Sequence, residues 1–240
     1  NKASIKNNPI AKYNLALMLD YGKGIKANDQ KAVELYKQAS KAGVLPATIN
    51  LAKYYYSNKD NKEMLDKSIY FFKQASLAND PHSNYQLGKI YEVGLAMPIN
   101  INKAKQHYQI AAKLGNIDAH VSLGRLHQSK IITEHSDLKA FEHYQTAARQ
   151  GSQFANYQMA KMMFYGVGTE HSTKKALVLL NKLKAKGYAP ATVMLKNIKD
   201  IEQAKIKRKK QEADLKKLNK KQENKVTALP KFEISLKKPE

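Results

Sequence analysis

The feature that most constrains the fold of this chain is an internal repeat with a step of 36 residues. An apolar residue recurs at this step, at Leu15, Leu51, Leu87, Leu123, Met159 and Leu195. The next position is small in five units, with Ala16, Ala52, Gly88, Gly124 and Ala160. No insertion or deletion changes the step between residues 11 and 195. Such a repeat predicts stacked units, because one unit of this size cannot bury its apolar face alone.

Each unit is predicted to contain two helices. The residues at positions 11, 15 and 19 of the first unit lie one turn apart, and those at 32, 36, 39 and 43 do so on a second helix. Position 36 is aromatic in four units, at Tyr36, Phe72, Tyr108 and Tyr144. Small residues at positions 16 and 32 let the helix backbones approach each other, while the ring at position 36 fills the space between neighbouring helices. Position 43 is Gly in four units and Asn79 in the second, which predicts a left-handed residue at the helix end.

The turn between the two helices differs among units. "GKG" at 22–24 and "GVG" at 166–168 indicate a glycine-dependent turn. Units two and four have "NKD" at 58–60 and "KII" at 130–132 instead. We therefore expect differently shaped turns in these two units.

The pattern resembles the Sel-one-like repeat (SLR) family, a relative of the tetratricopeptide repeat. Stretches such as "LDYGKGIKANDQKAVELYKQASKAG" and "IYEVGLAMPININKAKQHYQIAAKLGN" carry the resemblance, which covers about residues 8–195. It implies an all-α, right-handed superhelical solenoid of antiparallel helix pairs. We expect residues 1–195 to form five units and the first helix of a sixth. Residues 196–222 are then a charged capping helix, and residues 223–240 an extended tail.

Composition excludes several kinds of site. The chain has no Cys, which excludes thiol catalysis, disulfides, Cys-ligated zinc and iron–sulfur clusters. No apolar run approaches the ~20 residues of a membrane-spanning helix. Catalytic motifs are missing, and Gly-x-Gly lies between predicted helices, where it does not indicate a nucleotide site.

Histidines are the remaining candidates for metal binding. His120 and His127 share a helix face, and His107 and His143 are equivalent residues of consecutive units, but no Asp or Glu recurs beside them. We interpret them as packing or surface residues. The sequence therefore predicts a non-enzymatic protein without cofactor or metal.

The candidate binding residues lie on the first helix of each unit, on a face apart from the core stripe. Position 14 carries a hydrogen-bonding residue in five units, and position 17 is basic in four consecutive units. By resemblance to tetratricopeptide domains, this face lines a concave groove for peptides. Amides can satisfy an extended backbone, and a row of cations attracts acidic side chains or a terminal carboxylate. The predicted site comprises Asn14, Asn50, Lys53, Gln86, Lys89, Ser122, Arg125, Gln158 and Lys161.

The leading hypothesis is a scaffold that binds an acidic or C-terminal segment of a partner protein. The alternative is an electrostatic binder of polyanions, either nucleic acid or anionic envelope glycans and lipids. It rests on 42 Lys and Arg against 20 Asp and Glu, a net charge of +22. In "KIKRKK" at 205–210 the cations are followed by acidic residues and no nearby aromatic, which favours a solvated helix.

The expected location is the bacterial periplasm, the cell envelope or the outside of the cell, with the cytoplasm as the alternative. The chain begins at Asn1 rather than Met, so we expect that an upstream segment has been removed.

Overall fold

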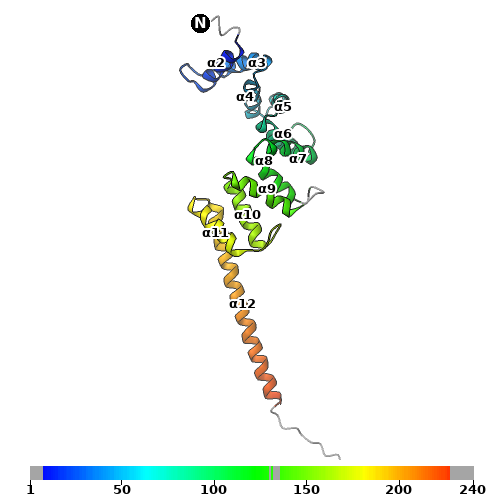
Figure 1. The fold of residues 1–240 in the computed structure, drawn as a ribbon, viewed down its shortest axis with the longest axis vertical. Helices are drawn as coiled ribbons and strands as arrows, with labels where there is room; N and C mark the ends of the chain where they lie inside the picture. The colour runs from blue at the N-terminus through cyan, green and yellow to red at the C-terminus, as the bar shows by residue number, and fades with distance from the viewer. Residues whose placement is uncertain (1–7, 130, 132–135, 228–240) are drawn as a thin grey trace, which may run out of the picture. The chain divides into compact units, whose positions relative to one another are not determined.

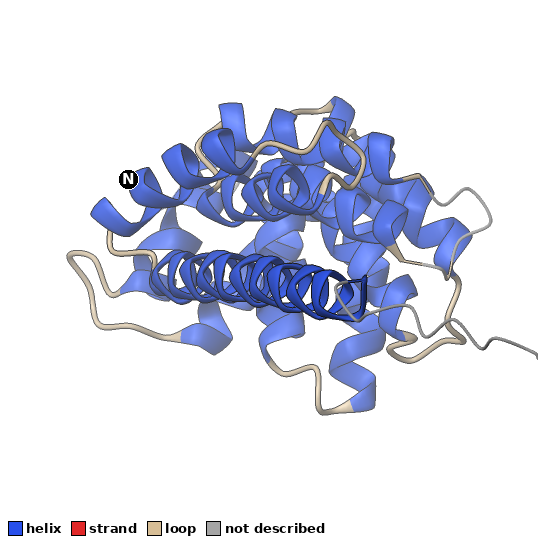
Figure 2. Cartoon of the chain, turned by 90° about the horizontal axis from the view of Figure 1, so that it is seen from below, coloured by secondary structure: helices blue, strands red, loops and turns tan. Residues whose placement is uncertain are grey.

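The structure is a computed structural model, and it describes residues 8–129, 131 and 136–227. Every secondary-structure element assigned in these ranges is an α-helix, which confirms the predicted all-α fold (Figures 1 and 2). Two compact units divide the chain, residues 1–179 and residues 180–240. The helices are α2 (Pro9–Tyr21), α3 (Asp29–Lys41), α4 (Leu45–Ser57), α5 (Lys62–Leu77), α6 (Pro81–Val93), α7 (Ile101–Lys113), α8 (Ile117–Gln128), α9 (Asp137–Arg149), α10 (Gln153–Tyr165), α11 (Thr173–Ala185) and α12 (Ala189–Thr227).

The helix boundaries follow the 36-residue step. The first helices of the units begin at residues 9, 45, 81, 117, 153 and 189, and the second helices at 29, 101, 137 and 173. The second unit is the exception, because α5 begins at Lys62 and has 16 residues, whereas α3, α7, α9 and α11 have 13. From α2 to α10 each helix packs against the next one in the chain. Consecutive helix pairs therefore stack, as the repeat predicted.

Side chains and backbone conformation explain where these helices begin and end. Asn28, Asn100 and Ser136 cap three of the second helices, since each accepts a hydrogen bond from the backbone N–H three residues later. The predicted left-handed residues at the ends of the second helices are confirmed. Their φ angles are +86° at Gly43, +59° at Asn79, +88° at Gly115, +95° at Gly151 and +77° at Gly187.

The core of residues 1–179 is built around the aromatic residue of each second helix. Tyr36, Tyr108 and Tyr144 are at most 2% exposed. Gly88 lies against one of these rings, and a Cβ atom there would be 2.5 Å from the Tyr108 ring. The small residue after each apolar Leu position therefore makes room for the ring, as the sequence suggested.

The hydroxyls of three second-helix tyrosines each bind a side chain 16 residues earlier in the same unit. The hydroxyl of Tyr36 donates to Asp20 (3.0 Å), that of Tyr108 to Glu92 (2.7 Å) and that of Tyr144 to Gln128 (3.0 Å). The second unit has Phe72 instead, which lacks a hydroxyl, and the residue 16 positions earlier is Tyr56. These two rings meet edge to face with centroids 5.8 Å apart. The acceptor is thus present where a buried hydroxyl needs one.

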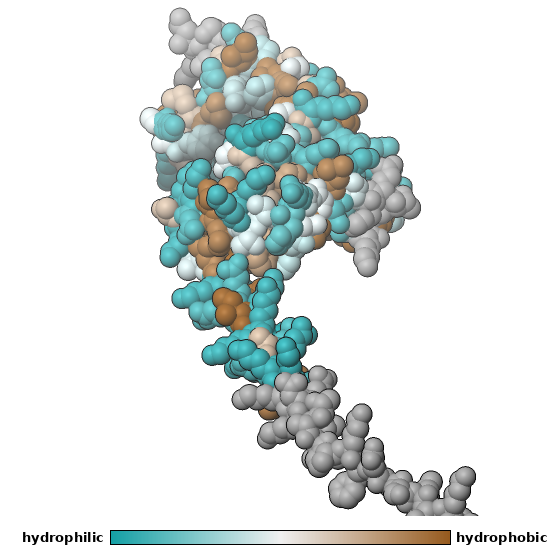
Figure 3. Space-filling view, turned by 60° about the horizontal axis from the view of Figure 1, so that its bottom comes forward, coloured by the Kyte–Doolittle hydropathy of each residue, from teal (hydrophilic) through white to brown (hydrophobic). Residues whose placement is uncertain are grey.

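In the second compact unit, α12 is one helix that contains both the predicted opening helix of the sixth repeat and the charged segment after it. Ala191, Met194 and Ile198 are buried, whereas residues 202–220 are exposed and mostly hydrophilic (Figure 3). The helix reaches Thr227, five residues into the predicted extended tail, and the remaining tail residues, 228–240, lie outside the described residues. Residues 223–227 include no Pro or Gly that would end the helix. Within the described part of the chain, every helix is too short or too polar to span a lipid bilayer.

Candidate functional site

The nine residues predicted to bind a partner all lie on first helices, from α2 to α10, and we call this surface the groove face. They differ in exposure. Asn14, Lys53 and Arg125 are exposed, Ser122 is buried, and the other five are partly buried. The sequence therefore placed them on consecutive equivalent helices, but it did not distinguish those that solvent can reach.

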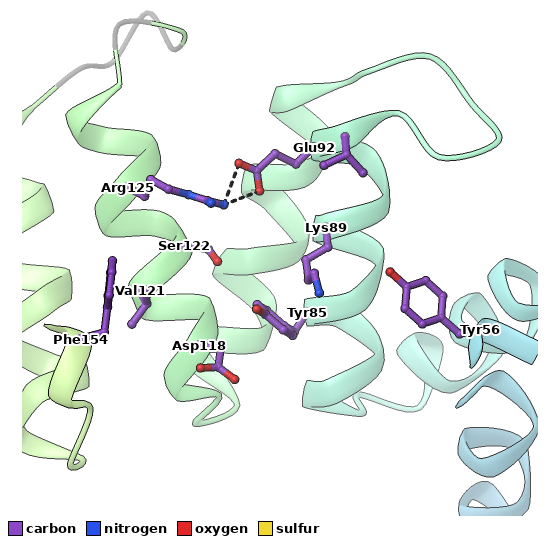
Figure 4. Close-up of a pocket in the computed structure, with 10 residues that line it drawn as sticks. Tyr56, Tyr85, Lys89, Glu92, Asp118, Val121, Ser122, Arg125 and Phe154 are labelled. Carbon is purple, nitrogen blue, oxygen red and sulfur yellow. Dashed lines mark hydrogen bonds and ion pairs between the residues drawn. The ribbon is translucent and has the colours of Figure 1, made fainter. Parts of the chain in front are cut away.

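A pocket of about 300 Å³ opens on the groove face (Figure 4). Lys89, Ser122 and Arg125 are the three predicted residues that line it. The remaining lining residues come from α4, α6, α8 and α10 and are Tyr56, Tyr85, Glu92, Val93, Asp118, Val121 and Phe154. The pocket thus uses the first helices of four consecutive units, and the six other predicted residues lie outside it.

Arg125 is already engaged within the pocket. Its Nη2 atom lies 2.8 Å from both carboxylate oxygens of Glu92, as Figure 4 shows. Glu92 also accepts the hydrogen bond from Tyr108, and its side chain is 19% exposed against 59% for Arg125. Burial, and then the hydrogen bond to Glu92, raise the pKa of Tyr108, so this hydroxyl keeps its proton. Arg125 is therefore held by a fixed carboxylate before any ligand arrives.

Three amide or hydroxyl residues of the groove face also have partners within the fold. Asn50 Nδ2 donates to the hydroxyl of Tyr36 in the preceding unit, at 3.2 Å. Ser122 is the equivalent residue two units later, and it bonds Tyr108. Burial and Glu92 raise the pKa of Tyr108, and the hydrogen bond to Ser122 lowers it in part. Gln86 Nε2 lies 3.4 Å from His82 Nε2. Asn50 and Ser122 therefore join neighbouring units, whereas Gln86 contacts a residue of its own helix, and the sequence pattern did not reveal these contacts.

The lysines of the groove face remain available for a ligand. Lys89 Nζ lies 5.7 Å from the ring centroid of Tyr85, and Lys161 Nζ lies 6.0 Å from that of Tyr157, each one helical turn away. Lys53 is exposed, and after burial it is the largest cause that lowers the pKa of His82, with Lys89 adding to it. Among the described residues, none of these three lysines forms a salt bridge.

Sequence reasoning missed the two carboxylates of the pocket, Glu92 and Asp118. A signal for Glu92 exists, because it lies 16 residues before Tyr108, as Asp20 does before Tyr36. No such signal marks Asp118, whose equivalents in other units are Ile10, Pro46, His82 and Phe154. Lys89 and Arg125 carry positive charges, so the four charged side chains of the pocket have a net charge of zero.

A histidine cluster connects α8 and α9. His120 Nδ1 and His143 Nδ1 are 3.1 Å apart, and the rings of His127 and His143 stack with centroids 5.6 Å apart. Burial, followed by the charges of His120 and His127, lowers the pKa of His143 to about 4. No group of three His, Cys, Asp or Glu side chains in the described ranges is arranged to hold a metal ion.

The comparisons with known proteins agree with this arrangement. The family model of the Sel1 repeat matches residues 9–44, 81–116, 117–152 and 153–188. Between these matches, residues 45–80 are not matched, and they form the second unit, with its longer α5 and its turn without glycine. A search of curated proteins found no match.

Solved structures of bacterial proteins share the fold. A protective antigen of uropathogenic Escherichia coli strains with an SLR fold is 24% identical, with a TM-score of 0.73 over 79% of this chain and 40% of its own. This chain therefore spans less than half of that antigen. A Sel1 repeat protein from Oxalobacter formigenes is 22% identical, with a TM-score of 0.68 over 77% of this chain and 73% of its own. With four matched repeats and a stack of paired helices, the chain belongs to the Sel1 repeat family.

Proposed function

We propose that this protein is a non-enzymatic scaffold that binds a segment of a partner protein on its groove face. The observation that carries the proposal is the pocket, which side chains from four consecutive first helices build. Helical repeats present such surfaces to extended ligands, because one ligand can contact equivalent positions of several units. Sel1 repeat proteins are generally scaffolds of this kind, and no enzyme family is indicated.

The partner segment is proposed to be acidic. Lys53 and Lys89 lie in adjacent units, outside the Arg125–Glu92 ion pair, and after burial their charges lower the pKa of His82, while the carboxylates of Asp80 and Asp118 raise it. Lys161 adds a third cation two units beyond Lys89. Carboxylates of an extended peptide can pair with these lysines, and a row of unpaired cations favours acidic segments over basic ones. Arg125 is not proposed to bind the peptide, because it is already paired with Glu92.

The proposal is tested with peptides selected from a random 12-residue phage library. We expect the selected peptides to be enriched in Asp and Glu. In fluorescence polarisation, the double substitution Lys53→Glu and Lys89→Glu should weaken binding of a selected peptide at least ten-fold, which corresponds to about 1.4 kcal/mol. The matched control is Lys31→Glu with Lys175→Glu, two exposed lysines of second helices, which changes the net charge equally.

The same experiment separates the scaffold from the polyanion binder. A 12-residue oligothymidylate serves as the polyanion probe. The general positive charge explains the interaction if three results are found together. The oligonucleotide binds, both double variants weaken its binding equally, and its affinity falls steeply as the salt concentration rises. Peptides without acidic enrichment, or equal losses in both variants, would reject the proposed groove.

A further inference from the structure

The pocket on the groove face is lined by apolar side chains as well as by charged ones. Its walls are rings and aliphatic side chains, with Tyr56 from α4, Tyr85 from α6, Val121 from α8 and Phe154 from α10. Phe154 is 40% exposed although it is large and apolar. Figure 4 shows Val121 next to Phe154 on one side of α8, and the ring of Tyr85 on the other side of α8, toward α6. The walls thus offer apolar surface that solvent reaches.

The charges at the pocket leave no net attraction for an ion. Arg125 and Glu92 neutralise each other at 2.8 Å, and Lys89 and Asp118 add one charge of each sign to the lining. A carboxylate that entered would meet two fixed carboxylates, and a cation would meet two fixed cations. An uncharged side chain loses no hydration of a charge and gains contact with the walls. Charge complementarity therefore selects a neutral occupant.

Size and wall chemistry narrow the occupant further. A volume of about 300 Å³ is at the lower end of ligand pockets, which suits one side chain rather than a larger molecule. Aromatic rings fill such a space with few rotatable bonds and pair with other rings in offset or edge-to-face geometry. The carboxylate of Asp118 can accept a hydrogen bond from a phenol or an indole.

We propose that this pocket binds an aromatic side chain of the partner segment, Tyr or Trp, while the acidic residues next to it in the segment pair with Lys53 on α4 and with Lys89 at the pocket wall. This inference rests on the proposed function and specifies the partner. The ring lies among Tyr85, Val121 and Phe154. The flanking carboxylates reach Lys53 and Lys89. The recognised segment is therefore an aromatic residue within an acidic stretch.

The first test uses single-residue probes and methyl NMR of the full chain. N-acetyl-L-tyrosinamide at millimolar concentration should shift the methyl signals of Val93 and Val121 and leave those of Val178 in place. N-acetyl-L-leucinamide and N-acetyl-L-aspartamide should each produce at least five-fold smaller shifts. Equal shifts with the leucine probe, or no shift with the tyrosine probe, would overturn the aromatic preference.

The second test uses the peptides acetyl-DDYDD-amide and acetyl-DDADD-amide. The tyrosine peptide should bind about ten-fold more tightly, and Phe154→Ala should remove that difference. The control Tyr70→Ala removes a ring of α5 that is more accessible than Phe154, 57% against 40% exposed, and should leave the difference intact. If both peptides bind equally but Lys53→Glu with Lys89→Glu still weakens them, the acidic groove stands and the aromatic pocket is wrong. If neither peptide binds, both proposals fail.

Discussion

Ala96 has a backbone conformation that two other units reserve for glycine. Its φ angle is +55°, and the equivalent residues are Gly24 at +74° and Gly168 at +66°. A residue with a Cβ atom is strained in the left-handed region, by about 1–2 kcal/mol. The third unit therefore keeps the turn of the first and fifth units and carries strain in it.

We expect Ala96→Gly to raise the free energy of unfolding by about 0.5–1 kcal/mol. Glycine removes the strain, although the greater freedom of the unfolded chain offsets part of the gain. Urea unfolding followed by circular dichroism measures the change. The matched control is Ala42→Gly, at the end of α3, where φ is −87° and glycine should destabilise. A lower stability for Ala96→Gly would show that the turn is not strained.

At the scale of the element, the joint between α8 and α9 depends on uncharged histidines. His120 and His143 share a hydrogen bond in which one Nδ1 must accept, and His127 stacks on His143. Lys139 on α9 adds positive charge nearby. Protonation would place cations within hydrogen-bonding distance of one another and remove the acceptor.

The pKa of His143 sets the direction of the pH dependence. Its pKa is about 4 in the folded chain and ~6.5 unfolded, so the unfolded state takes up protons first. Stability is therefore complete above pH 6.5 and is lost as the pH falls from 6.5 towards 4. We expect a loss of about 1–2 kcal/mol from this residue between pH 7.5 and 4.5, since its partial exposure reduces the effect.

The substitution His143→Leu tests this joint, because unit five carries Leu179 at the same position. Urea unfolding at pH 7.5 and 4.5 should show a smaller acid-induced loss in the variant than in the original chain. Phe71→Leu, at the equivalent position of unit two, should lower stability equally at both pH values. An unchanged acid-induced loss in His143→Leu would place the sensitivity elsewhere.

The same elements show why the fold was predictable and the site only in part. Leu51, Gly88 and Tyr108 have equivalent contacts in several units, so their roles appear as repeated residues in the sequence. The state of Arg125 depends on one side chain 33 positions away, Glu92, in a different unit. Asp118 has no equivalent acidic residue elsewhere. A repeat pattern reports what units share, whereas a pocket is built from what distinguishes them.

At the scale of the molecule, the described units are unequally buried. In α2 only Ala16 is fully buried, whereas α8 buries six residues. In a stack where each unit contacts only its neighbours, stability is roughly the sum of local contributions. Opening of one part therefore does not require opening of the whole.

Amide hydrogen exchange should reveal this difference. We expect the amides of α2 to exchange at least ten-fold faster than those of α8 at neutral pH, because less apolar surface must be exposed to open α2. Mass spectrometry of peptides covering the two helices measures the rates in one sample. Equal protection of both helices would mean that the stack opens only as one cooperative body.

The bond between the second-helix tyrosine and the acceptor 16 residues before it has a consequence for how such a chain changes in evolution. Both partners belong to the same repeat, as with Asp20 and Tyr36 or Gln128 and Tyr144. A recombination event that duplicates or deletes one whole repeat therefore carries the donor and its acceptor together. No hydroxyl is stranded in the interior, and the gene can gain or lose 36 codons at a time while its product still folds.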